Sequence, residues 1–242
     1  MLHFYKWLCI FPVLALSTAL IGTTIVFFSL LRIPPRASQK LASFWARLNA
    51  AVCLMHVDVL GLENLVGDQS YILVVNHLSL VDIFVLYGFL RRDLKWVIKS
   101  ELKFVPFLGQ ACMAMGNIFV DRKNTDRDVQ AISRASASIK QGDCVIFFPE
   151  GTRSRDAVLG PFKKGAFRMA KEHNLPLVPI TLHDTHLVLP SDSINWRPGK
   201  VTMEIHRAIL ISTDVDPSQL SNRVREIIAN SLELMKEKQL NL

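Results

Sequence analysis

The sequence predicts an α/β fold: a mixed, largely parallel sheet covered by helices, preceded by an N-terminal membrane-anchoring helical segment. In residues 57–242, short apolar runs alternate with helical patterns. Strands of continuous apolar composition are typical of sheets that are covered on both faces. Before them, the 24 residues from Leu8 to Leu31 include no Asp, Glu, Lys, Arg or His. We therefore divide the chain into an anchoring segment, 1–56, and an α/β domain, 57–242.

The Leu8–Leu31 run is long enough to cross a membrane. As an α-helix it would measure about 36 Å, against a hydrocarbon core of about 30 Å. A secretory signal peptide is the alternative, because Lys6 precedes the run. The run is long for a signal peptide, however, and Arg32-Ile33-Pro34-Pro35-Arg36 follows it instead of small residues. We favour a retained anchor that either spans once or dips in and returns near Gly22-Thr23-Thr24.

Basic residues cluster after the apolar run. Arg32, Arg36, Lys40 and Arg47 follow it, against Lys6 before it. By the positive-inside rule, the body of the protein lies on the cytoplasmic face. The net charge of +7 and the 50% hydrophobic content suit anionic lipid or phosphorylated substrates. Nucleic acid fits the charge alone, and no basic and aromatic pattern supports it.

A helix is expected to begin after Ser38, beyond the Pro34-Pro35 boundary. Its apolar stripe fits a core-packed helix and a helix on the membrane surface equally well. The stripe consists of Leu41, Phe44, Trp45, Leu48, Val52 and Met55.

Seven strands and four further helices are expected after this segment. The strands are Val57–Leu60, Tyr71–Val75, Lys95–Ile98, Asn117–Val120, Cys144–Phe148, Leu177–Leu182 and Val201–Ile205. Three helices are Leu80–Phe89, Thr125–Ile139, which opens with a capping-box spacing of Thr125 and Asp128, and Phe162–Glu172. The last begins at Asp216-Pro217, an N-cap followed by Pro at the first helical position.

The cysteines and a histidine pair do not indicate a metal site. The four cysteines are far apart and lack a CxxC spacing, so we interpret them as reduced packing residues. His183 and His186 are three residues apart, but the sequence offers no convincing third ligand. We expect no metal and no cofactor.

The most informative stretch is Val74-Val75-Asn76-His77-Leu78-Ser79-Leu80-Val81-Asp82. An apolar strand ends at His77, and an acid follows five residues later. In isolation, the pair would be a surface histidine and a helix-capping aspartate. A strand end is where α/β folds place their sites, however, so His77 is a candidate general base with Asp82 fixing its tautomer. Because no G-x-S-x-G elbow is present, His77 would act on a substrate hydroxyl directly.

A second group of polar residues follows the strand that ends at Phe148. Gly151 lets the backbone approach a ligand, Thr152 offers a hydroxyl, and Arg153 offers a fork suited to phosphate. Glu150 would repel a phosphate, so we expect it to orient Arg153 or backbone amides. A charged, solvated turn is the alternative.

These residues resemble the four ordered motifs of the glycerolipid acyltransferases. The motifs are Asn76-His77-x-Ser79-x-x-Asp82, Gly116-x-x-Phe119-Val120-x-Arg122, Phe148-Pro149-Glu150-Gly151-Thr152-Arg153-Ser154 and Val178-Pro179-Ile180. The closest resemblance is to 1-acyl-sn-glycerol-3-phosphate, or lysophosphatidate, acyltransferases, over roughly residues 57 to 206. Because proline has no N–H to donate within a sheet, we expect Pro179 at a sheet edge or at a bulge.

The resemblance implies a membrane-bound enzyme that moves an acyl chain to the free hydroxyl of a membrane lysophospholipid. Acyl-CoA or acyl-carrier protein would be the co-substrate. His77 and Asp82 would be catalytic, while Arg122 and the loop of Glu150, Gly151, Thr152 and Arg153 would hold the acceptor's phosphate.

Three alternatives remain beside this hypothesis. The first keeps the chemistry with another acceptor, such as glycerol 3-phosphate, another lysophospholipid or a lyso-ornithine lipid. The second is a membrane-tethered lipid-binding protein without turnover, which would have no need of the His77–Asp82 pair. The third is a hydrolase, which the lack of a nucleophile disfavours.

Overall fold

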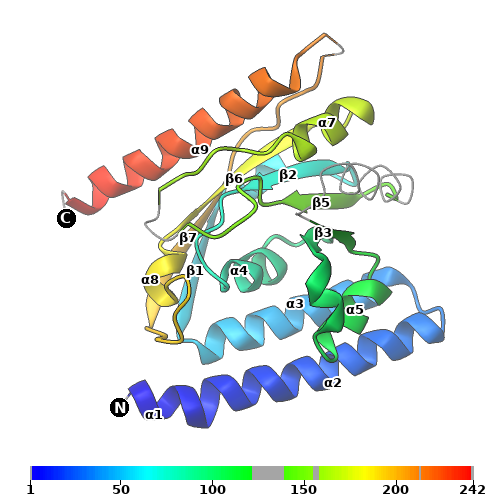
Figure 1. The fold of residues 1–242 in the computed structure, drawn as a ribbon, viewed down its shortest axis with the longest axis vertical. Coiled ribbons are helices and arrows are strands. Elements are labelled where there is room, and N and C mark those ends of the chain that lie inside the picture. Colours follow the sequence, from blue (N-terminus) through cyan, green and yellow to red (C-terminus); the bar gives the residue numbers. More distant parts are fainter. Residues whose placement is uncertain (1, 122–138, 155–157, 213, 241–242) are drawn as a thin grey trace.

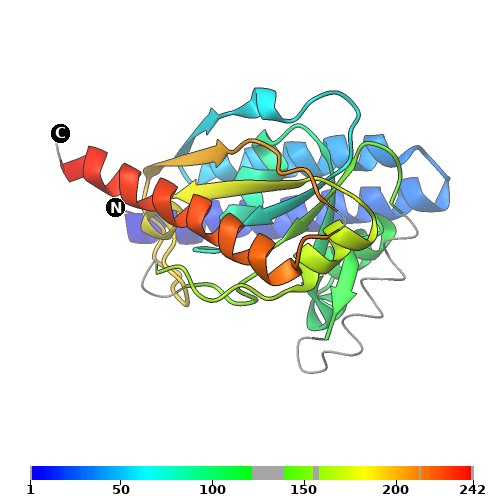
Figure 2. The same cartoon turned by 90° about the horizontal axis from the view of Figure 1, so that it is seen from above.

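The computed structural model describes residues 2–121, 139–154, 158–212 and 214–240 (Figure 1). The expected Thr125–Ile139 helix, apart from Ile139, and the candidate phosphate ligand Arg122 lie outside these ranges. Both termini lie at the same end of the molecule (Figures 1 and 2).

A seven-stranded sheet forms the centre, in the order β1-β7-β6-β2-β5-β3-β4. Neighbouring strands are parallel except for β6 and β7, which are antiparallel. The prediction of a mixed, largely parallel sheet is therefore confirmed. The strands are β1 Met55–Leu60, β2 Tyr71–Val75, β3 Asp93–Lys99, β4 Ile118–Val120, β5 Asp143–Phe147, β6 Leu177–His183 and β7 Gly199–Ile205.

Helices cover both faces of the sheet (Figure 1). On one face lie α7 (Gly165–Glu172) and α9 (Pro217–Leu240), and on the other lie α4 (Asp82–Phe89) and α3 (Pro35–Val52). Successive β2 side chains point to opposite faces, as strand geometry requires. Consequently Leu73 belongs to the apolar cluster on the α4 side, and Ile72 belongs to the cluster that includes Phe167 and Val224.

Two helix starts illustrate what local sequence can decide. As expected, α9 begins at Pro217, and Asp216 Oδ1 accepts a hydrogen bond from the Ser218 N–H at 3.1 Å. The helix α3 begins earlier than expected, with Pro35 at its first position. It also ends earlier, because Leu54 takes a φ of 54° and turns the chain into β1.

The expected apolar stripe of α3 is only partly its buried face: Leu41, Trp45 and Val52 pack against apolar clusters. Phe44 is 59% exposed, whereas Ala42, Ala46 and Ala50 are buried. The helix lies between α4 and the anchor helix α2 (Phe11–Leu30). Small side chains suit helices that must pack closely on two sides. The prediction that Met55 extends the stripe is also wrong, because Met55 opens β1.

The anchor helix is docked on the domain. Residues Lys6–Leu30 form the only helix among those described that is long and apolar enough to cross a membrane. Only 17% of its most apolar 18-residue stretch is buried in the protein. Trp45 Nε1 of α3 donates to the Thr18 hydroxyl at 3.1 Å. A Cβ added at Gly22 would lie 2.9 Å from the Phe107 carbonyl oxygen, so the chain before α5 (Leu108–Ala114) packs directly against α2.

The remaining short elements were not anticipated from sequence. Besides α5, they comprise α1 (Leu2–Tyr5), α8 (Thr185–Val188) and 3-10 turns at Leu62–Asn64 and Ser100–Phe104. A few residues of weak periodicity do not distinguish such turns from loops. The π-helical turn Lys6–Ile10 leads directly into α2 and overlaps the expected helix at its first residues.

Pro179 lies in the central strand β6, at a bulge in the pairing with the chain that leaves β7. Ile180 pairs with Ile205, and Leu177 pairs with Ile209. Two residues of β6 are therefore opposite three residues of the partner. The bulge accommodates a residue that has no N–H to donate, as expected from the sequence.

Candidate active site

The candidate site lies at one edge of the sheet, where several strands end. β2, β5, β6, β3 and β4 run in the same direction, so their carboxyl ends meet there. His77 follows β2, and the Glu150–Arg153 loop follows β5. In open α/β sheets, ligands bind at such an edge.

His77 and Asp82 form a hydrogen-bonded pair. His77 Nδ1 lies 2.7 Å from Asp82 Oδ2, and the Asp82 side chain is fully buried. The same oxygen accepts the backbone N–H groups of Leu78 at 2.9 Å and Ser79 at 3.0 Å. Because a carboxylate oxygen only accepts, Nδ1 carries the proton and Nε2 is left as the basic nitrogen.

Phe148 supports the imidazole from one side. The rings of His77 and Phe148 stack with centroids 3.9 Å apart and an interplanar angle of 14°. The Phe148 ring also contacts Trp96, with ring centroids 5.9 Å apart. The His77 side chain remains 14% exposed. The ring is thus fixed by one carboxylate and one aromatic face, and it is open to a ligand.

Glu150 accepts hydrogen bonds from backbone amides, which is one of the two roles expected for it from the sequence. Its Oε1 accepts the His77 N–H at 3.0 Å, and its Oε2 accepts the Gly160 N–H at 2.9 Å. Burial raises the pKa of the Glu150 carboxyl, and the two backbone N–H groups oppose that rise. The carboxylate therefore connects the His77 loop to the loop after β5.

Gly151 and Thr152 occupy the turn of that loop. Gly151 has a φ of +78°, a conformation that side chains rarely adopt. A Cβ at Gly151 would lie 3.0 Å from Cε and Nζ of Lys163. Thr152 is exposed.

Arg153 lies beside an aspartate that the sequence did not indicate. An Arg153 terminal guanidinium nitrogen, Nη2, is 3.6 Å from Asp192 Oδ1, and the Arg153 side chain is 28% exposed. The structure thus brings His77, Asp82, Glu150, Gly151 and Arg153 to one edge of the sheet. No pattern in the sequence singled out Asp192, because its role depends on a chain reversal after α8.

His183, one of the two histidines considered as metal ligands, is engaged by other side chains. His183 Nε2 lies 3.1 Å from the Ser231 hydroxyl of α9 and 3.6 Å from Glu204. Burial lowers the pKa of His183 and also that of His186. Within residues 2–121, 139–154, 158–212 and 214–240, no group of three His, Cys, Asp or Glu side chains is placed to hold a metal ion.

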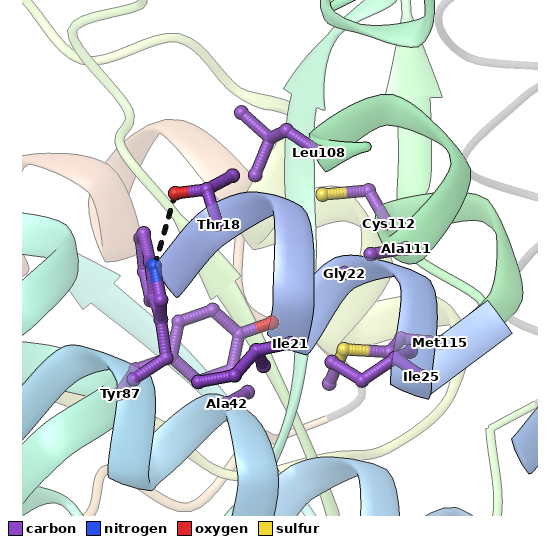
Figure 3. Close-up of a pocket in the computed structure, with 11 residues that line it drawn as sticks. Thr18, Ile21, Gly22, Ile25, Ala42, Tyr87, Leu108, Ala111, Cys112 and Met115 are labelled. Carbon is purple, nitrogen blue, oxygen red and sulfur yellow. Dashed lines mark hydrogen bonds between the residues drawn. The ribbon is translucent and has the colours of Figure 1, made fainter. Parts of the chain in front are cut away.

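An apolar cavity lies between the anchor and the domain (Figure 3). Ile21 and Ile25 of α2, Tyr87 of α4 and Met115 beside α5 contribute to its lining. Its volume is about 50 Å³. One water needs about 10–15 Å³ of such space, so the cavity as it stands has room for only a few waters.

Comparison with known proteins gives consistent relatives. The sequence model of the family described as Acyltransferase matches residues 56–183. A chloroplastic 1-acyl-sn-glycerol-3-phosphate acyltransferase of Brassica napus is 36% identical over 205 residues, covering 83% of this chain and 58% of the relative. A chloroplastic enzyme of the same description from Arabidopsis thaliana is 37% identical over 202 residues, covering 81% of this chain and 55% of the relative. The chain thus spans little more than half the length of these relatives.

A solved structure is similar along nearly the whole chain. It is the crystal structure of the 1-acyl-sn-glycerophosphate acyltransferase PlsC from Thermotoga maritima, which is 26% identical with a TM-score of 0.81. The match covers 97% of this chain and 95% of the solved one.

Proposed function

Because the chain belongs to the acyltransferase family, we propose that it transfers an acyl chain to the sn-2 hydroxyl of 1-acyl-sn-glycerol 3-phosphate, giving phosphatidate. The observation that carries the proposal is the 2.7 Å contact of His77 Nδ1 with the buried Asp82 carboxylate. This contact leaves Nε2 as a base at the edge where strands end.

In the proposed reaction, His77 Nε2 takes the proton of the acceptor hydroxyl while the hydroxyl oxygen attacks the thioester carbonyl carbon. Asp82 stabilises the imidazolium that forms. The tetrahedral intermediate collapses by breaking the carbon–sulfur bond. The imidazolium returns its proton to the departing thiolate, so the step ends with an ester, a free thiol and neutral His77.

The phosphate of the acceptor would bind to Arg153 and the loop around it. A guanidinium suits phosphate oxygens, and Gly151 allows the backbone to approach them. Arg122, outside the described residues, belongs to this proposal through its motif, because β4 ends at Val120 on the same edge. Glu150 would serve indirectly, through the His77 and Gly160 amides.

The acyl donor would be acyl-CoA or acyl-carrier protein. A thioester supplies the leaving thiolate, so the reaction needs no cofactor. An assay that offers both donors separately determines which one the protein uses.

We further propose that the protein is membrane-bound, with α2 lying in one leaflet. The helix has partners along its length: Asn49 of α3 bonds the Ser17 hydroxyl, and Gly22 touches the chain at Phe107. Before it, Lys6 Nζ donates to Asn195 Oδ1 at 3.1 Å. A helix crossing the bilayer with these contacts intact would carry charged residues of α3, such as Arg47, into hydrocarbon, which is costly.

The outward face of α2 fits this arrangement. Leu16, Leu20, Phe27 and Leu30 are each more than half exposed. An exposed apolar face suits the hydrocarbon of a membrane, and the net charge of +7 suits anionic lipid. We propose that the catalytic domain lies on the cytoplasmic face, in accordance with the basic residues that follow the anchor.

The test is acyl transfer by the purified protein in phospholipid vesicles, using labelled donor and lysophosphatidate. His77→Ala should lower kcat by about 100- to 10,000-fold. His173→Gln, which changes an exposed histidine directly after the C-terminal end of α7, is the matched control and should retain activity. Full activity of His77→Ala would overturn the proposal.

The same assay separates the alternatives. A panel of glycerol 3-phosphate, other lysophospholipids and a lyso-ornithine lipid tests the acceptor. Donor hydrolysis without an acceptor would indicate a hydrolase. Binding of lipid with no turnover on any acceptor would indicate a lipid-binding protein.

A further inference from the structure

We propose that Ser191 is a positioning residue that holds the His77 loop and the Arg153 loop in register. The inference rests on the proposed function and deepens it. It gives the segment after α8 a role in setting the distance between the base and the phosphate site.

Ser191 lies between the two loops. Its hydroxyl oxygen is 3.0 Å from the Leu78 carbonyl oxygen and 2.9 Å from the Ser154 carbonyl oxygen. A hydroxyl has one proton, so it donates to one of these carbonyls at a time or shares the proton between them. Leu78 follows His77 directly, and Ser154 follows Arg153 directly. The one side chain therefore bonds to the residue next to each functional group.

A direct bond between the loops defines the register that Ser191 reinforces. The Ser154 N–H donates to the His77 carbonyl oxygen at 2.9 Å. The N–H and the carbonyl of Ser154 are thus both engaged, one by His77 and one by Ser191. Without Ser191, the hydrogen bonds that join the two loops among the described residues are the Ser154–His77 backbone bond and the bond from the His77 N–H to Glu150, and neither holds the Leu78 carbonyl.

Neighbouring contacts place the same segment against both loops. The Ser79 hydroxyl donates to the Leu189 carbonyl oxygen at 2.6 Å. Asp192 Oδ1 lies 3.6 Å from the Arg153 guanidinium. The segment 189–192 therefore contacts the His77 loop at two points and the Arg153 loop at two points, and the Ser191 hydroxyl contacts both.

The physical consequence concerns acceptors that use both loops. A phosphate held by Arg153 fixes the acceptor, and His77 must then reach its hydroxyl. Small errors in that distance strongly lower the reaction rate. An acceptor without phosphate does not engage Arg153, so the register of the loops has less effect on its reaction.

The experiment compares Ser191→Ala with the wild type in vesicles, using lysophosphatidate and the monoacylglycerol of the same chain. Ser191→Ala should lower kcat/KM for lysophosphatidate roughly tenfold, since one shared hydrogen bond is lost. The donor KM should not move. The effect on the monoacylglycerol should be less than about twofold, and Ser191→Thr, which restores the hydroxyl, should recover most activity.

Ser193→Ala is the matched control. The Ser193 hydroxyl accepts the Asn195 N–H at 3.0 Å within its own turn, so this variant should behave as the wild type. A second background isolates the coupling. In Arg153→Ala, adding Ser191→Ala should cost less than about twofold, because the phosphate is no longer anchored.

Equal losses on both acceptors, or a full tenfold loss in the Arg153→Ala background, would overturn the positioning role and leave only a structural one. Thermal unfolding of each variant separates that case from misfolding. If the wild type makes no phosphatidate, the proposed function has failed. An active wild type with an unaffected Ser191→Ala means that this inference alone has failed.

Discussion

The backbone N–H of His77 donates to Glu150 Oε1 over 3.0 Å, across 73 residues of sequence. The second Glu150 oxygen accepts the Gly160 N–H. A carboxylate in the middle of a proposed phosphate site thus has a structural partner on each oxygen. Its negative charge is directed at backbone donors, which resolves the apparent conflict with an anionic acceptor.

Glu150→Gln should impair both folding and turnover. An amide has only one acceptor oxygen, so either the His77 or the Gly160 N–H would face a donor. Leaving a buried donor unsatisfied costs about 1–3 kcal/mol, measurable as a lower free energy of unfolding, and kcat should fall about tenfold or more. The exposed Glu101→Gln is the control, with an expected change within about 0.5 kcal/mol. Wild-type stability and kcat in Glu150→Gln would show that the two bonds contribute little.

Gly151→Ala should destabilise the loop after β5. A side chain at a φ of +78° costs roughly 1–2 kcal/mol, and the new Cβ would also press on Lys163. Gly67→Ala is a matched control, because Gly67 has a φ of +52° and no atom within 4 Å of an added Cβ. Denaturant unfolding should show a larger loss for Gly151→Ala, with a raised acceptor KM. Equal losses would assign the effect to backbone strain alone.

Gly22→Ala tests whether the anchor is docked. In an isolated helix, this change stabilises by about 0.5–1 kcal/mol. Here the added Cβ would lie 2.9 Å from the Phe107 carbonyl oxygen, so we expect a loss of about 1–3 kcal/mol from overpacking. Thermal unfolding in detergent or vesicles measures whether Gly22→Ala is more or less stable than the wild type. Thr23→Ala, at an exposed position on the same helix, is the control, and a stabilised Gly22→Ala would mean that α2 leaves the domain.

Acidification should destabilise the region beneath α9. Burial lowers the pKa of His183 and of His206, and Glu204 between them opposes this shift. In the unfolded chain these histidines bind protons at a higher pH than in the folded chain. The resulting stability is present above the ordinary histidine pKa of about 6.5 and is lost as pH falls through the lower folded values.

Thermal unfolding between about pH 7.5 and pH 5.5 measures this dependence. His183→Asn should flatten the pH slope of Tm even though it removes the contact with Ser231. Ser193→Ala, which removes no titratable side chain, should leave the slope unchanged. An unaltered slope in His183→Asn would assign the acid sensitivity to other groups.

Local patterns anticipated most of the fold. All seven strands and the start of α9 follow from apolar runs and from the Asp216-Pro217 signal, because each depends on neighbours in sequence. The predicted stripe of α3 is correct only in part, and the reason is tertiary. The helix is packed on two sides, so small residues such as Ala46 are buried while Phe44 faces outward. Short elements such as α5 have too few residues to show a period.

The sequence by itself determined the chemical groups: a histidine with an acid five residues later, an arginine-bearing loop after a strand, and an apolar helix in front of both. Those depend on residue type and spacing alone. Only the tertiary structure decided their relations. Three contacts join residues that are far apart in sequence. They are the hydrogen bond of the His77 N–H to Glu150, the hydrogen bonds of Ser191 to two loops, and the packing of α2 at Gly22 against the Phe107 carbonyl. Such contacts are specified by the packing of the whole sheet and its helices, so no local pattern encodes them.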